Sequence, residues 1–214
     1  MADDFDLIDA WANGDNNAAR EILRRHTAPL YRFFERKIDG PIEDMVQDTL
    51  LACIEGRDRF RREAGFRAYV FGIARHVLFA QLRKKRRDGG EIDLESSSLC
   101  ELVPTPSQMV GGKKEQQILL EALRHLPVET QVLFELYHWQ NLTAHEIAAI
   151  LGIGERAVRS RLRRAKDELR KAVERVAESP IMLRSTWADF EGWAKALPKL
   201  EDDGDGDGDD GGDA

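Results

Sequence analysis

Cysteine is scarce in this chain of 214 residues, and the two that occur, Cys53 and Cys100, do not form a Cys-x-x-Cys pair. This gives no support to a disulfide scaffold or to a zinc site built from thiolates. Long apolar runs are also missing, since no segment approaches the roughly 18 residues of a membrane span. The acidic N-terminus lacks an apolar signal core, so we expect a protein of the reducing cytoplasm without membrane insertion.

Strand-like alternation of apolar and polar residues is absent as well. Apolar residues instead repeat at helical spacing over residues 7–87 and 113–176. The intervening residues 88–112 contain acidic residues, serines, prolines and glycines but no base. We therefore predict an all-α fold of two small helical domains, 7–87 and 113–176, joined by a flexible acidic linker over 88–112.

The C-terminal part carries the charge imbalance. Residues 201–214 contain eight acidic residues and no base, and without them 31 acidic residues face 32 basic ones. Their Asp/Gly composition predicts a disordered tail, and residues 177–200 before it are expected to form a helical extension. The tail either adds inert solubilising charge, which we favour, or competes with DNA for basic helices.

Residues 142–158 have the pattern of a helix-turn-helix. Thr143 is placed to cap a short helix, Glu146 completes a capping box, and Gly152 stands where a left-handed residue ends the helix. The second helix lies within residues 155–171, which contain eight basic and three acidic residues. Helical angles put these bases on outward and flanking positions, where arginines can pair with guanine edges and hold phosphates. The candidate DNA-binding residues are Arg156, Arg159, Ser160, Arg161, Arg163 and Arg164.

Residues 66–87 contain seven bases, four aromatic residues and no acid. Bases can follow a phosphate backbone while aromatic rings stack on unpaired nucleobases, which suits single-stranded or melting DNA. By itself this signal is weak, because aromatic residues at helical spacing more often belong to a core and a basic run is often a solvated helix end.

These motifs together resemble a known family. Residues 42–50 and 66–75, with the basic run that follows, are similar to region two of bacterial sigma-70 factors, and residues 126–165 are similar to region four. The order and spacing resemble the extracytoplasmic-function group over residues 7–172. The resemblance implies a sigma factor, not an enzyme, that binds core RNA polymerase and opens promoter DNA. The five histidines show no spacing of metal ligands, and we expect neither a metal nor a cofactor. An anti-sigma factor or another regulator is a further candidate partner.

The resemblance also implies roles for residues. Polymerase binding would fall to the helix that starts at Ile42, although its acidic residues could equally form a solvated face. Region four would read the distal promoter element as a duplex, and region two would recognise and melt the upstream element. The candidate polymerase-binding residues are Glu43, Asp44, Gln47 and Asp48. The candidate upstream-element residues are Phe66, Arg67, Tyr69, Arg75, His76, Arg83 and Lys84.

Some positions depart from the family pattern. Tyr69 and Val70 stand where Trp-Leu is usual, His76 stands where Asn is usual, and residues 154–157 are atypical for the turn and helix start. Both promoter elements are therefore expected to be atypical. Two other functions stay open at this point: a stand-alone helix-turn-helix regulator, which leaves residues 42–87 unused, and a protein-interaction module. Binding to core polymerase distinguishes the sigma factor from both.

Overall fold

The computed structural model describes residues 3–35, 37–38, 40–57, 60, 64–85, 98 and 114–176. The predicted linker apart from Ser98, the predicted extension and the predicted tail lie outside these residues, as do Arg86 and Arg87. Within the described part every secondary-structure element is a helix, which confirms the all-α prediction. The only strand-like pairing there is an isolated bridge between Ser98 and Pro127.

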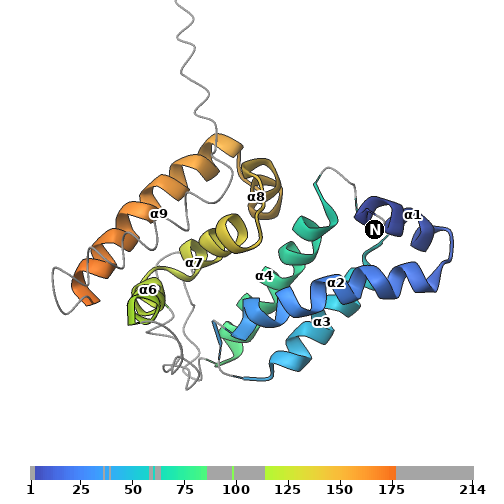
Figure 1. Cartoon of the computed structure of the whole chain (residues 1–214), viewed down its shortest axis with the longest axis horizontal. Coiled ribbons are helices and arrows are strands. Elements are labelled where there is room, and N and C mark those ends of the chain that lie inside the picture. Colours follow the sequence, from blue (N-terminus) through green and yellow to red (C-terminus); the bar gives the residue numbers. More distant parts are fainter. Residues whose placement is uncertain are drawn as a thin grey trace, which may run out of the picture.

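Four helices form the first half of the fold (Figure 1). They are α1 (Asp4–Ala12), α2 (Asn16–Glu35), α3 (Ile42–Glu55) and α4 (Phe66–Lys85). Polar caps set the first two boundaries. Asp3 and Asp6 form a capping box at the start of α1, and Asp15 accepts hydrogen bonds from the first amides of α2. Gly14, at φ +94°, makes the turn between them.

Helix α3 buries a stripe that only partly follows the one its apolar residues suggest. The sequence predicts an inner face of Met45, Val46, Leu50 and Ile54. Met45 and Val46 are buried, but Ile54 is 43% exposed. Thr49 and Cys53 are buried instead. Seven residues at about 100° each bring Cys53 back to within 20° of Val46, whereas Ile54 is rotated about 80° away. Burial also raises the pKa of the Cys53 thiol to about 12.

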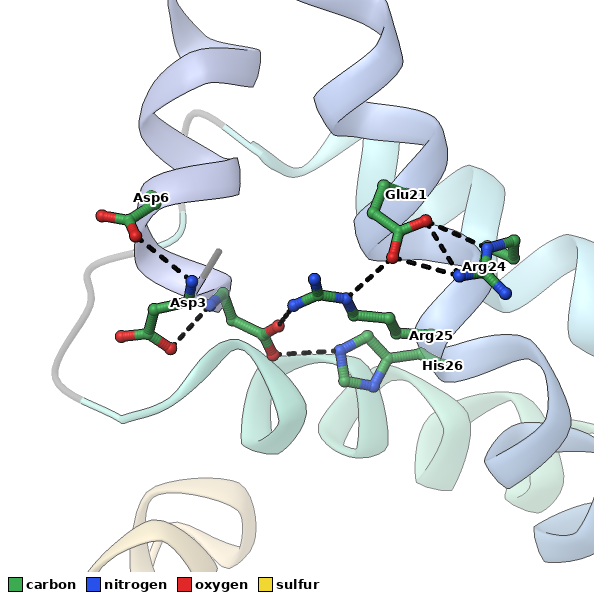
Figure 2. A network of polar contacts seen from close by, with 7 residues as sticks. Asp3, Asp6, Glu21, Arg24, Arg25 and His26 are labelled. Atoms are coloured by element: carbon green, nitrogen blue, oxygen red, sulfur yellow. Dashed lines mark hydrogen bonds and ion pairs between the residues drawn. The ribbon is translucent and has the colours of Figure 1, made fainter. Parts of the chain in front are cut away.

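A polar network ties α1 to α2 (Figure 2). Arg25 donates to Asp4 at 2.9 Å and to Glu21 at 3.1 Å. Beside it, His26 Nε2 lies 3.5 Å from Asp4 Oδ2, and the His26 ring meets the edge of Phe66 at 5.5 Å. Burial lowers the pKa of His26, so its neutral form is favoured. The first helix is thereby fixed against the start of α4.

The second half contains α6 (Lys114–Arg124), α7 (Val128–Phe134), a π-helical turn η3 (Glu135–Trp139), α8 (Ala144–Leu151) and α9 (Glu155–Val176). The sequence predicts that Val158, Leu162, Ala165 and Leu169 form the inward face of the last helix, and all four are buried. Part of this stripe packs with α6 and Phe134 in a separate apolar cluster.

The two halves pack directly on one another, and the sequence did not predict this. Helices α4 and α8 lie side by side (Figure 1). One apolar core runs from α1–α4 into the facing sides of α7, α8 and α9. Gly72 on α4 faces Ile150 on α8, and a Cβ built at Gly72 would make an ordinary van der Waals contact with Ile150 Cγ1, at 3.8 Å.

A chain of buried polar groups crosses the same contact. Lys37 Nζ, after the end of α2, donates to Glu135 Oε2 in η3 at 3.1 Å, and both side chains are at most 3% exposed. Gln140 donates to Glu135 Oε1 at 2.9 Å and accepts from Arg67 on α4 at 3.1 Å. Lys37 also lies over the Phe33 ring at 4.1 Å. These hydrogen bonds connect Lys37 of the first half to Glu135 of the second, and Glu135 through Gln140 to Arg67 of the first half.

Removing one partner of the Lys37–Glu135 pair leaves a buried charge without its counterion. We expect Glu135→Gln to lower the free energy of unfolding by about 3 kcal/mol. In Lys37→Met/Glu135→Met, apolar side chains of similar size replace both charges, and most of that loss should be recovered. Urea denaturation of the single and double variants measures both values. A double variant at least as unstable as Glu135→Gln would contradict this account.

Stability should also depend on pH through His138. Burial, with a smaller contribution from Lys166, lowers the pKa of His138 from 6.5 to about 4, and its ring stacks on Phe134. The unfolded chain therefore binds more protons than the folded chain between pH 6.5 and 4. Stability is complete above pH 6.5 and falls as the pH drops, by about 2 kcal/mol at pH 5.

His138→Phe keeps an aromatic ring and removes the titration. Urea denaturation at pH 7 and pH 5 should show a smaller loss in this variant than in the wild type, while His76→Asn, at an exposed position, should match the wild type. An unchanged pH dependence in His138→Phe would show that His138 is not the group responsible.

Candidate nucleic-acid interface

Helices α8 and α9 form the helix-turn-helix that the sequence predicts. Thr143 accepts from the Glu146 amide at 3.2 Å, and the Glu146 carboxylate accepts from the Thr143 amide at 2.8 Å, so the predicted capping box is confirmed. Gly152 follows α8 with φ +66° and ψ +32°, the left-handed conformation that glycine adopts without strain. The turn therefore places α9 from local sequence alone.

One face of α9 is basic and open to solvent. Arg156, Ser160 and Arg163 are exposed and recur at helical spacing. Arg159, on the same face, is half-buried and lies 3.5 Å from Glu155, which also contacts His145 at 2.9 Å. This carboxylate orients Arg159 at the start of the helix. The face has the form that enters a major groove, with arginine forks near the helix N-terminus.

Two other predicted residues of α9 lie on its flank. Arg161 and Arg164 line an open pocket of about 230 Å³ whose apolar lining is Leu133, Leu151 and Ala165. Arg161 is half-buried there and Arg164 is exposed. The six residues proposed from the sequence therefore form an outward face of four and a flanking pair, which matches a division into base-edge and phosphate contacts.

The aromatic residues at the start of α4 are packed against neighbouring helices. Phe66 is only 3% exposed and meets His26 and Phe60. Tyr69 is half-buried, and its hydroxyl occupies the space that a Cβ at Gly56 would need. In this conformation the Phe66 ring is not available for stacking on a nucleobase, and the Tyr69 ring is partly covered.

The predicted bases of α4 divide into two groups. His76, Arg83 and Lys84 are exposed. Arg67 donates to Gln140, and Arg75 forms an ion pair with Glu129 of α7 while its guanidinium lies 4.5 Å from the centre of the Phe79 ring. Burial lowers the pKa of Arg67. Two of the predicted DNA contacts are thus engaged by the helix-turn-helix half of the same chain.

The four residues proposed for polymerase binding form a single exposed surface on α3. Glu43 accepts from the Tyr31 hydroxyl at 3.0 Å, and this hydrogen bond raises the pKa of Tyr31. Next to them are two large apolar side chains that the sequence analysis did not propose, Leu51 at 54% and Ile54 at 43% exposure. The helical angle of each position relative to the buried stripe would have identified both. We call this set, Glu43, Asp44, Gln47, Asp48, Leu51 and Ile54, the α3 surface.

The described residues contain neither a membrane span nor a cluster of metal ligands. None of their helices is both long and apolar enough to cross a membrane. No three of their His, Cys, Asp or Glu side chains gather as metal ligands would.

Comparisons with family models match both halves of the chain. The model described as sigma-70 region 2 matches residues 20–88, and the model described as sigma-70, region 4 matches residues 116–169. Among curated proteins, the chain is 28% identical to RNA polymerase sigma factor NccH of Alcaligenes xylosoxydans xylosoxydans over 165 residues, 74% of this chain and 88% of that protein. It is 24% identical to the ECF RNA polymerase sigma-E factor of Escherichia coli K12 over 179 residues, 78% of this chain and 93% of that protein.

Two solved structures resemble the fold. The structure of sigma factor RpoE with anti-sigma factor NepR from Bartonella quintana aligns with a TM-score of 0.54 and 25% identity, over 72% of this chain and 96% of that one. The structure of CnrH with the cytosolic domain of CnrY aligns with a TM-score of 0.59 and 22% identity, over 81% and 99%. The second likeness concerns the fold alone.

Binding to duplex DNA should depend on the outward face of α9. We expect Arg163→Ala to weaken binding to a specific site by about 1–3 kcal/mol if the guanidinium touches a base. If it touches a phosphate, the slope of log K against log salt should fall by about 0.9 for each phosphate that is no longer neutralised. Fluorescence anisotropy over a salt series distinguishes the two cases.

Arg170→Ala is the matched control, because Arg170 is exposed on the same helix and pairs with Glu174 away from the turn. Its affinity and salt slope should equal those of the wild type. Equal decreases in affinity for Arg163→Ala and Arg170→Ala would indicate general charge attraction without a specific face.

Proposed function

The chain belongs to the extracytoplasmic-function group of the sigma-70 family, whose members direct transcription initiation, and we propose that its surfaces divide this work among three tasks. The α3 surface binds core RNA polymerase. Helix α4 recognises and melts the upstream promoter element. Helix α9 reads the distal element in duplex DNA. The observation that supports this division best is that the α3 surface and the basic face of α9 lie on separate halves and are both exposed.

The α3 surface suits a protein partner better than solvent. Leu51 and Ile54 present apolar area beside Asp44, Gln47 and Asp48, and an apolar centre with a polar rim is the usual composition of an interface. The acidic rim would select a partner surface that carries basic residues, because opposite charges guide association and exclude like-charged surfaces.

The positive charge of helix α4 suits it to recognise and melt the upstream element. His76, Arg83 and Lys84 are exposed along the helix, whose described residues include no acid. Such a helix attracts the phosphates of a separated strand, and His76 can stack on an unpaired base or form a hydrogen bond to it.

The proposed role requires no chemical step from the chain itself and no cofactor. Its partners are core polymerase and promoter DNA, so we place its action in the cytoplasm. Because the sigma factor RpoE, which has a similar fold, has been solved with the anti-sigma factor NepR, an anti-sigma factor is a further proposed partner of this chain.

Transcription in vitro tests the proposal. Purified protein, bacterial core polymerase and genomic fragments that include the chain's own upstream region should give discrete transcripts only when both proteins are present. The start sites then locate the two promoter elements. Core binding can be measured separately by pull-down or by anisotropy of labelled protein.

Leu51→Ser/Ile54→Ser should lower affinity for core polymerase at least about tenfold, because the interface would bury two apolar side chains fewer. Its duplex DNA binding should stay unchanged, since α9 is untouched. Phe5→Ser, at a 39% exposed position on α1, is the control and should bind core like the wild type. DNA binding by the wild type without any core binding would instead favour the stand-alone regulator.

A further inference from the structure

The carboxylate of Glu155 bridges the two helices of the helix-turn-helix. Glu155 is the first residue of α9, and its Oε1 lies 2.9 Å from Nδ1 of His145 on α8. Its other oxygen, Oε2, lies 3.5 Å from Nη2 of Arg159, which follows one turn later on α9. One carboxylate therefore connects a histidine of the first helix to an arginine on the outward face of the second.

The backbone at both ends of this bridge is set by the fold. His145 lies in the first turn of α8, between Thr143 and Glu146 of the capping box. Glu155 opens α9 soon after the left-handed Gly152, at a helix N-terminus where the helix dipole favours a negative charge. Helices α8 and α9 also pack on each other. What remains to be fixed is the direction of the side chains.

The direction of the Arg159 guanidinium depends on Glu155. Arg159 Nε is buried and has no hydrogen-bond partner among the residues that the structure describes, so no other described polar group holds this side chain. The bond to Glu155 is long for a hydrogen bond, and the Arg159 side chain is 40% exposed. Its fork therefore still has donors to offer outside the chain, and guanine O6 and N7 are acceptors that match such a fork.

The Glu155–Arg159 pair is too weak to hold this direction by itself. Both side chains are 40% exposed, and water screens an ion pair of two long side chains on a helix surface, which also lose rotamer freedom by pairing. His145 is shorter and belongs to the other helix. Its contact with Oε1 restricts the rotation of the carboxylate from outside α9, which no residue one turn along the same helix can do.

We propose that His145 is a positioning residue for duplex recognition: through Glu155 it holds the Arg159 guanidinium in the direction from which a guanine edge is read. Because Arg159 is oriented before DNA arrives, it loses less side-chain freedom on binding. This gain applies to the base sequence that matches the held direction, so His145 contributes to specificity without touching a base. The inference rests on the proposed function, since it refines how α9 reads the distal element.

A double-mutant cycle tests the inference on the full-length chain. The probes are a labelled duplex selected from a random pool by the wild type and the same duplex with the selected bases scrambled. Anisotropy at one fixed salt concentration gives both affinities. His145→Ala should lower the affinity for the selected duplex about three- to tenfold and leave that for the scrambled duplex unchanged. His145→Ala/Arg159→Ala should bind like Arg159→Ala, because His145 acts only through Arg159.

A conservative variant distinguishes positioning from charge. His145→Asn keeps an N–H donor at about the place of Nδ1 but removes the titratable ring. It should bind both duplexes within about twofold of the wild type. His125→Ala is the matched control, because His125 forms a similar exposed pair with Glu121 on α6, at 3.5 Å, and it should change neither affinity.

The outcomes separate this inference from the proposed function. Additive losses in the double variant would overturn the inference, and so would His145→Asn binding as weakly as His145→Ala. Equal losses on both duplexes would also overturn it, because they indicate that His145 contacts a phosphate directly. Each of these results leaves the proposed function intact. If the wild type selects no sequence, duplex reading by α9 fails, and that part of the proposed function falls together with the inference.

Discussion

The ion pair between Lys37 and Glu135 determines how the two halves of the chain meet. Each charge is buried, so neither half can shift along the other without leaving an uncompensated charge in a site that excludes water. Glu135 extends this constraint through Gln140 to Arg67, which links the end of α2, the π-helical turn and the start of α4. Apolar packing alone would tolerate several arrangements of two small helical units, whereas this set of hydrogen bonds tolerates one.

That arrangement divides the basic residues of the chain by what they touch. On α9, Arg156 and Arg163 are exposed to solvent, where a polyanion can contact them. On α4, Arg67 and Arg75 meet the polar groups of the second half, although the sequence presents them as part of the same basic surface as Arg83. A count of charges along the chain therefore overstates the basic surface that this structure exposes to nucleic acid.

The errors in interpreting α3 and α4 have a common origin. Ile54 belongs to an apolar series along the sequence, but its helical angle turns it to solvent. Phe66 belongs to an aromatic and basic segment, but His26 and Phe60 enclose its ring. In both cases composition indicated the chemical character of a segment. The direction of the side chain decided whether that residue faces solvent or packs inside the protein.

The sequence by itself determined the helices, the helix-turn-helix and the outward face of α9, because caps, the glycine turn and helical periodicity act over a few neighbouring residues. It also contained the motifs of regions two and four, from which the family could be identified. Only the tertiary structure decided that the two halves close on one another and that Arg67 and Arg75 face Gln140 and Glu129. Those pairings join residues that lie 73 and 54 positions apart. At such separations no local pattern specifies the partner, since the partner depends on how the whole set of helices packs.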